Sequence, residues 1–156
     1  MEPEPLLTPA DADFVQGDVS INVAARTADL APVMARGLGC RVASDRREIT
    51  VILSRSIAAS VLDCLAENGA IAAVFTLPST HQTLKLKGTD ARVLEIDPAD
   101  LGLIPDDRRK FALDLARMGY TPQFAAAVVP LMDDLVAARF TPTAAFDQTP
   151  GPDAGK

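Results

Sequence analysis

Hydrophobic and polar positions alternate with a period of two over several short stretches of this chain, which is the pattern of half-buried β-strands. In one stretch Val19, Ile21 and Val23 alternate with small or polar residues, and in another Leu84 and Leu86 alternate with lysines. Turn-forming Gly, Pro, Asn, Asp or Ser residues separate many of these stretches. We therefore predict six strands, over residues 19–24, 32–43, 49–53, 70–77, 83–96 and 135–141.

The period changes to that of an α-helix between the third and fourth of these strands, where Ile57, Val61 and Leu65 lie four residues apart. Ser56 is a candidate N-cap for this helix, and Asn68-Gly69 supplies its C-terminal end. Further helices are predicted to begin at Thr8-Pro9, Pro105 and Thr121-Pro122, and to end at Gly17, Gly119 and Pro130.

Six strands at short spacing with few helices predict a mainly β protein of the α+β class, built on a small closed antiparallel barrel with flanking helices. The length of 156 residues suits a single domain, which we place over residues 1–150, with a tail over residues 151–156. The segment from Asp147 onward is rich in Gly and Pro, so we expect it to form an extended arm.

Composition narrows the classes of function. The net charge of −6 and the dispersed basic residues argue against nucleic acid as a partner. No apolar run approaches the roughly 20 residues that span a bilayer, and the acidic N-terminus is unlike a secretory signal, so we expect a cytoplasmic protein without a membrane segment. A single His and two separated Cys residues predict no metal site. The 48% hydrophobic content hints at an interface between subunits.

The first candidate site is Ser54-Arg55-Ser56, at the point where a strand gives way to a helix. Free backbone N–H groups and the guanidinium of Arg55 there could bind a phosphate group. The alternative is that Ser56 only caps the helix and Arg55 is solvated. The residues by themselves leave both interpretations open.

The second candidate site is the run from Pro78 to Gly88, where a hydroxyl-rich turn leads into a strand with an outward cationic face. Gln82, Thr83 and Lys85 could contact a flat heteroaromatic ligand lying along that strand. The alternative is an edge strand whose lysines discourage aggregation. His81 lies in the turn, where it is solvated, donates a proton near a flavin, or serves as an axial haem ligand.

The run from Pro78 to Gly88 resembles the motif of the pyridoxamine 5′-phosphate oxidase-like family of FMN-binding split-barrel proteins. Phe146 to Pro152 resembles the closing segment of one branch of that family, and Leu53 to Ser56 resembles its phosphate-binding turn. The likeness extends in order from about Ala12 to Pro152.

The resemblance implies a six-stranded antiparallel split β-barrel that forms a homodimer, with FMN bound at the subunit interface. It places the phosphate at Arg55 and Ser56 and the flavin ring along Gln82, Thr83 and Lys85. Backbone groups of Val51 and Ile52 would also approach the ring. The implied function is an FMN-dependent oxidoreductase acting on a small organic substrate or NAD(P)H.

Two departures from the family pattern narrow this function. The basic C-terminal signature of vitamin B6 oxidases is absent from the sequence, so vitamin B6 oxidation is not expected. Ile57-Ala58-Ala59 also stands where many relatives carry a further Lys or Arg. Because the flavin performs the redox chemistry, we assign no catalytic residue. The alternatives are a non-enzymatic flavin- or haem-binding protein, acting as a sensor or store, and a partner-binding scaffold.

Overall fold

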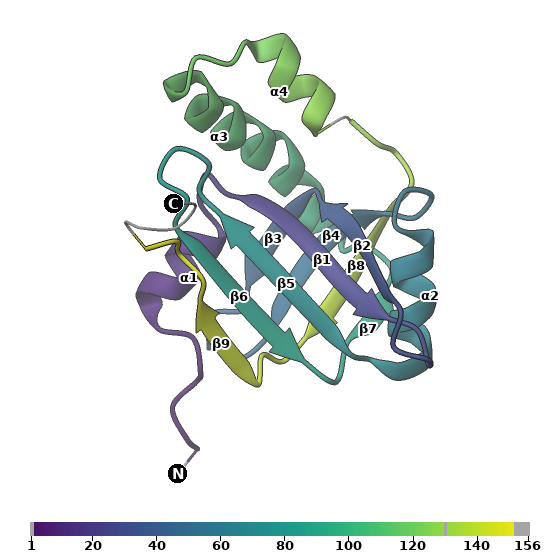
Figure 1. The fold of residues 1–156 in the computed structure, drawn as a ribbon. Coiled ribbons are helices and arrows are strands. Elements are labelled where there is room, and N and C mark those ends of the chain that lie inside the picture. The colour runs from purple at the N-terminus through teal and green to yellow at the C-terminus, as the bar shows by residue number, and fades with distance from the viewer. Residues whose placement is uncertain (1, 130, 152–156) are drawn as a thin grey trace.

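Nine strands form two antiparallel sheets in the computed structural model of the chain, which describes residues 2–129 and 131–151 (Figure 1). Sheet A has the order β2 (Pro32–Gly37), β1 (Ser20–Arg26), β5 (Ile71–Thr76), β6 (Thr83–Gly88) and β9 (Ala144–Asp147). Sheet B has the order β3 (Gly39–Val42), β4 (Ile49–Ser54), β8 (Leu135–Phe140) and β7 (Arg92–Leu94).

Neither sheet is closed, so the predicted six-stranded closed barrel is not confirmed, whereas the mainly β, α+β class is confirmed. The predicted strand over residues 32–43 is divided at Leu38, whose N–H donates to the Ile52 carbonyl at 2.8 Å. The predicted strand over residues 83–96 ends in sheet A at Gly88, and the chain then enters sheet B as β7. Each long stretch thus supplies one strand to each sheet.

β9 was not predicted, and it ends at Asp147, where the predicted extended arm begins. It pairs with β6, with Lys85 opposite Phe146 and Leu86 opposite Ala145. Beyond it the Gln148 N–H donates to the Thr83 carbonyl at 2.9 Å, which extends the pairing by one residue. Residues 152–156 of the predicted tail lie outside the described residues.

Five helical elements accompany the sheets within the described residues: α1 (Pro9–Val15), α2 (Ala59–Asn68), the 3₁₀ helix η1 (Pro98–Gly102), α3 (Leu103–Arg117) and α4 (Pro122–Val128). Thr8 and Thr121 cap α1 and α4 as predicted, because their hydroxyls accept the N–H groups of Asp11 and Phe124. Gly69 ends α2 in the left-handed conformation, also as predicted. The predicted stop at Pro130 lies outside the described residues.

The prediction of Ser56 as the N-cap of α2 is wrong. The helix begins at Ala59, and the cap residue Ala58 offers no side-chain hydrogen bond. Ser56 lies earlier, in the turn between β4 and α2, where its own N–H is occupied by a carboxylate from a distant segment.

The core lies between the inner faces of the two sheets, where Phe75, Leu86, Val51 and Phe140 are fully buried. In β6 the alternation is as predicted, since Leu86 is buried and Lys87 is exposed. No described helix is both long and apolar enough to cross a membrane.

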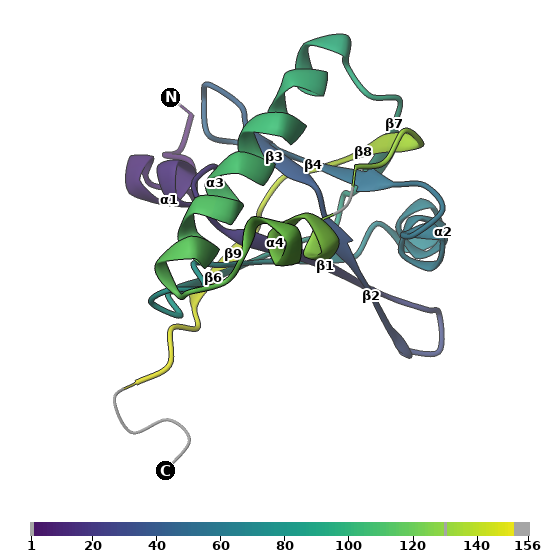
Figure 2. The same cartoon turned by 90° about the horizontal axis from the view of Figure 1, so that it is seen from above.

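The outer face of sheet A is open over most of its area. Figures 1 and 2 show α2 and α1 at the sides of the two sheets and the α3–α4 hairpin over one end, with no helix over the middle of the sheet. This end of sheet A carries the start of β1 and the end of β5, and the candidate site lies there.

Candidate functional site

A cleft of about 410 Å³ opens where the α3–α4 hairpin meets the end of sheet A. Its sheet side is formed by Ser20, Arg36 and Thr76, which come from β1, β2 and β5. The turn between β5 and β6 adds Pro78 and His81. The helical side is apolar and includes Phe111, Leu115, Met118, Tyr120, Phe124 and Val128.

Arg36 is the only Lys or Arg among the residues that line this cleft. Within the described part of the chain it forms no ion pair with an acidic side chain. Its Nη1 atom is buried and has no hydrogen-bond partner in the described part of the chain. Burial lowers the pKa of the guanidinium, as expected when a charge is withdrawn from water without a partner. Buried polar groups are normally paired, so the unpartnered guanidinium makes Arg36 a candidate for contact with a bound group.

The helical side of the cleft exposes large apolar side chains. The rings of Tyr120 and Phe124 stack with centroids 4.6 Å apart and planes inclined by 16°. Met118 lies two residues before Tyr120 and is also exposed. Exposed apolar groups gathered in a concave site are typical of ligand-binding surfaces.

The opposite side of the cleft, the β5–β6 turn, is fixed to α3 by a buried carboxylate. Asp114 is fully buried and accepts the backbone N–H of Ser79 at 2.9 Å and its hydroxyl at 2.6 Å. Arg117 donates to the same carboxylate at 3.1 Å. Burial opposes the charge of Asp114, but these hydrogen bonds together lower its pKa. The turn also holds His81 in a left-handed conformation with φ of 62°.

A row of side chains crosses the outer face of sheet A from the cleft. Strand register places Arg36 beside Asn22, Asn22 beside Val74, Val74 beside Lys85, and Lys85 beside Phe146. Neighbouring strands are about 4.8 Å apart, so Arg36 and Lys85 start roughly 14 Å from each other. A cation thus lies toward each end of a row that has an amide and an apolar residue between them.

Three of the predicted cofactor-binding residues lie together at the start of β6. Lys85 belongs to the row just described, and Thr83 points from the same outer face beside Thr76. Gln82 lies in the turn immediately before, exposed to solvent. The Thr83 N–H is already occupied, since it donates to the Thr149 hydroxyl at 3.0 Å.

The predicted phosphate-binding turn lies elsewhere and already holds an anionic group of the chain itself. The Asp134 carboxylate accepts the Ser56 N–H at 2.7 Å and the Ser54 hydroxyl at 2.8 Å. These bonds, chiefly those from Ser56, hold the pKa of Asp134 at about 2. Arg55 is exposed and lies 3.6 Å from Glu95. The donors assigned to a phosphate are therefore largely occupied by Asp134.

Val51 and Ile52, predicted to approach the flavin ring through backbone groups, are fully buried in β4. β4 is an inner strand of sheet B and pairs with β3 on one side and β8 on the other. Figures 1 and 2 place the start of α2, next to the end of β4, on the opposite side of the molecule from the β5–β6 turn. Within one chain the structure does not bring the two predicted groups of residues together.

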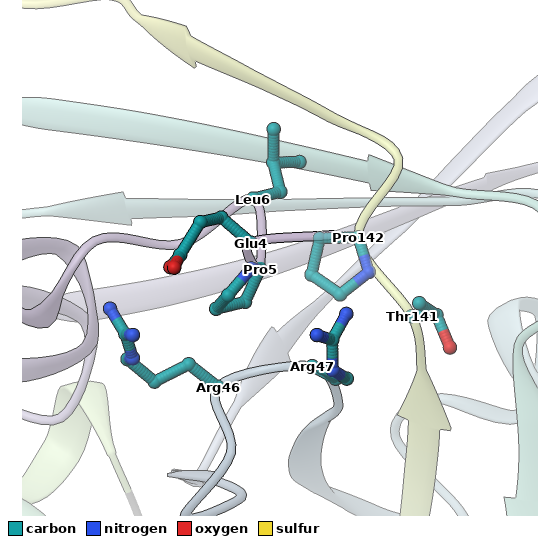
Figure 3. Close-up of a pocket in the computed structure, with 7 residues that line it drawn as sticks. All are labelled: Glu4, Pro5, Leu6, Arg46, Arg47, Thr141 and Pro142. Carbon is teal, nitrogen blue, oxygen red and sulfur yellow. The ribbon is translucent and has the colours of Figure 1, made fainter. Parts of the chain in front are cut away.

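A second hollow, of about 250 Å³, lies between the N-terminal segment and the β3–β4 turn (Figure 3). Arg46 and Arg47 point toward that segment, and both donate to its carbonyl groups, Arg46 to Leu7 at 3.2 Å and Arg47 to Pro3. Since these guanidinium groups have partners, we interpret them as holding the N-terminal segment in place.

Asp107 lies next to the cleft and leads to a prediction on pH dependence. Burial raises its pKa to about 6, although the Cys40 N–H donates to it at 3.1 Å. Because the folded-state pKa exceeds the unfolded value, the folded state binds more protons and stability falls as pH rises from about 4 to 6. Asp107 should account for a fall of up to about 3 kcal/mol in the free energy of unfolding over this pH range, and we expect D107N to remove that fall.

Denaturant unfolding of the wild type and D107N between pH 4 and 7.5 measures this effect. The exposed neighbour Asp106 supplies the control. Its charge is only a minor cause of the raised pKa of Asp107, so D106N should leave most of the slope in place. A D107N protein whose stability retains the wild-type dependence on pH would show that Asp107 is not its source.

No group of three or more His, Cys, Asp or Glu side chains suitable for a metal ion is found among the described residues. Cys40 and Cys64 are both buried and both carry free thiols. Burial raises the pKa of the Cys40 thiol, so this side chain is unreactive at neutral pH.

No family model and no curated protein matches the sequence. Solved structures nevertheless share its fold over most of both chains. HupZ from Group A Streptococcus has a TM-score of 0.58 at 15% identity, covering 96% of this chain and 100% of that chain. An F420 reductase has a TM-score of 0.55 at 13% identity, covering 86% of this chain and 94% of that chain. A putative pyridoxamine 5′-phosphate oxidase from Lactobacillus delbrueckii has a TM-score of 0.54 at 13% identity, covering 90% of this chain and 93% of that chain.

Proposed function

Because the chain has the fold of the pyridoxamine 5′-phosphate oxidase-like proteins, we propose that it binds FMN on the outer face of sheet A and acts as a flavin-dependent oxidoreductase. The observation that supports this proposal is the open face itself, with Lys85 and Thr83 directed outward on it. The names of two similar structures, an F420 reductase and a putative pyridoxamine 5′-phosphate oxidase, indicate the same class of chemistry.

The residues on this face suit the chemical groups of a flavin. The side chain of Val74 offers an apolar surface for a flat ring, and the amide of Asn22 can donate to ring carbonyl groups. The Thr83 hydroxyl donates its proton to the His81 carbonyl at 2.9 Å, so its oxygen can accept from a ring N–H. Lys85 supplies a positive charge beside them. When bound, FMN supplies the hydride or electron transfer, and the protein orients it.

A homodimer forms part of the proposal. The turn from β4 to α2, which carries Arg55, lies on the opposite side of the molecule from the start of β6, which carries Lys85. One cofactor would therefore meet both residues only if two copies each contribute one of them. The open face of sheet A is the surface that a second copy would cover. Asp134 already occupies the Ser56 donors, so Arg55 is the group expected to assist the phosphate there.

A thermal shift titration with FMN tests the cofactor site. We expect the melting temperature of the wild type to rise with FMN and to saturate. K85A should raise the FMN concentration that gives half of the maximal shift roughly tenfold, since it removes a charge-assisted contact. K87A removes the same charge two residues further along the strand and is the matched control. Wild-type melting that ignores FMN would contradict the proposal, as would equal responses of K85A and wild type.

A further inference from the structure

We propose that the cleft between the α3–α4 hairpin and sheet A binds a small amphipathic carboxylate. Its carboxylate pairs with Arg36, and its flat apolar body lies against Tyr120 and Phe124. This is a second site, separate from the cofactor site at Lys85, and it does not require that FMN binds.

The first step of the argument is the state of Arg36. Its buried Nη1 lacks a hydrogen-bond partner in the part of the chain that the structure describes, and no acidic side chain there forms an ion pair with it. Asp107 also lines the small hollow next to the cleft, but its carboxylate accepts the Cys40 N–H instead. An unpaired guanidinium in a partly buried place costs free energy that a bound anion would recover.

The second step concerns the kind of anion. A guanidinium presents two parallel N–H groups that match the two oxygens of a carboxylate. Arg36 is the only Lys or Arg side chain among the residues that line the cleft. A single positive charge suits a monoanion, whereas a dianionic phosphate is usually held by several donors and charges. The charge balance therefore favours a carboxylate.

The third step concerns the rest of the ligand. Met118, Tyr120 and Phe124 are each more than two-fifths exposed, although all three are large and apolar. Their rings and chains face the same cleft as Arg36. Offset stacking on Tyr120 or Phe124 would favour a planar aromatic body. The cleft volume of about 410 Å³ lies within the range of small-molecule sites.

The position of the cleft also suggests a role. Arg36 and Lys85 belong to the same row on the outer face of sheet A, so a ligand in the cleft would lie beside a flavin at Lys85. Such a ligand would be the organic substrate of the oxidoreductase. This assignment of role, unlike the binding site itself, rests on the proposed function.

Calorimetric titration with 2-naphthoate tests the site. We expect binding to the wild type, about tenfold or greater weakening in R36Q, and a smaller loss in R36K, which keeps the charge without the planar fork. F124A should weaken binding several-fold. R109A is the matched control, because Arg109 is exposed on α3, outside the cleft. This variant should bind 2-naphthoate as the wild type does.

Tyrosine fluorescence gives a second readout, since Tyr120 is the single Tyr of a chain without Trp. Bound 2-naphthoate should quench Tyr120 emission, with N-acetyltyrosinamide as the control for light absorption by the ligand. If R36Q does not fold, as circular dichroism would show, R36K and the uncharged 2-naphthamide take its place. The amide should bind at least tenfold more weakly than the acid.

Several outcomes would overturn the proposal: unchanged affinity in R36Q or R36K, equal binding of the amide, or tighter binding of 2-naphthyl phosphate than of the acid. Displacement of 2-naphthoate by FMN would also overturn it, because the cleft would then belong to the cofactor. Failure of FMN to bind at all, with 2-naphthoate still held by Arg36, would refute the cofactor proposal and leave this one standing.

Discussion

Replacing Asp114 with alanine is expected to lower the free energy of unfolding by about 3 kcal/mol or more. The fully buried carboxylate accepts two hydrogen bonds from Ser79 and one from Arg117. Hydrogen bonds to a charged group each contribute about 1.5–3 kcal/mol, and the substitution leaves a backbone N–H without a partner. Denaturant unfolding at pH 7 measures the loss.

The variants S79A and D106A calibrate this effect. S79A removes the hydroxyl but keeps the backbone N–H that bonds to Asp114, so it should cost less than D114A. D106A removes an exposed carboxylate near the start of the same helix and should change stability little. A D114A protein as stable as D106A would show that the β5–β6 turn is held by other contacts.

The variant G88A is expected to lower the free energy of unfolding by about 1–3 kcal/mol, because an added methyl group has no room at this position. A Cβ atom at Gly88 would lie 2.7 Å from Cδ2 of Phe140 and 2.9 Å from the Thr141 carbonyl oxygen. Phe140 is fully buried and the carbonyl belongs to the backbone, so neither can withdraw easily.

The matched control for G88A is G102A. No atom lies within 4 Å of a Cβ placed at Gly102, and the backbone there is already helical. G102A should therefore be neutral or slightly stabilising. Equal melting temperatures for G88A and G102A would contradict the close approach of β6 to Phe140.

Much of the strand content could be predicted from short hydrophobic stretches bounded by turn residues, which located β1, β4, β5 and β8 and the start of β6. Clear alternation marked β1 and β6, whereas β4 is buried on both faces. The local pattern could not show that the chain leaves sheet A at Gly37 and Gly88, because which sheet a strand joins depends on its distant pairing partners. β9 was missed because Ala144–Asp147 carries no alternation and owes its structure to pairing with β6.

The candidate site was only partly predictable, for a related reason. Thr83 and Lys85 could be placed on an outward face from the local pattern alone. Arg36 could not be singled out, since its lack of a partner depends on strands and helices distant in sequence. Asp134 likewise reaches Ser56 across 78 residues, a contact that local spacing cannot reveal. Local patterns thus predicted which side of a strand faces outward. Which hydrogen-bond donors remain without a partner depends on tertiary contacts.

The absorption spectrum of the purified chain, with and without added FMN, tests the central claim most directly. We expect flavin bands in the protein as purified, or flavin retained after FMN is added and the excess is removed. A Soret band would contradict the choice of flavin and make His81 the residue to test as a haem ligand. A colourless protein that retains no FMN would contradict flavin binding altogether.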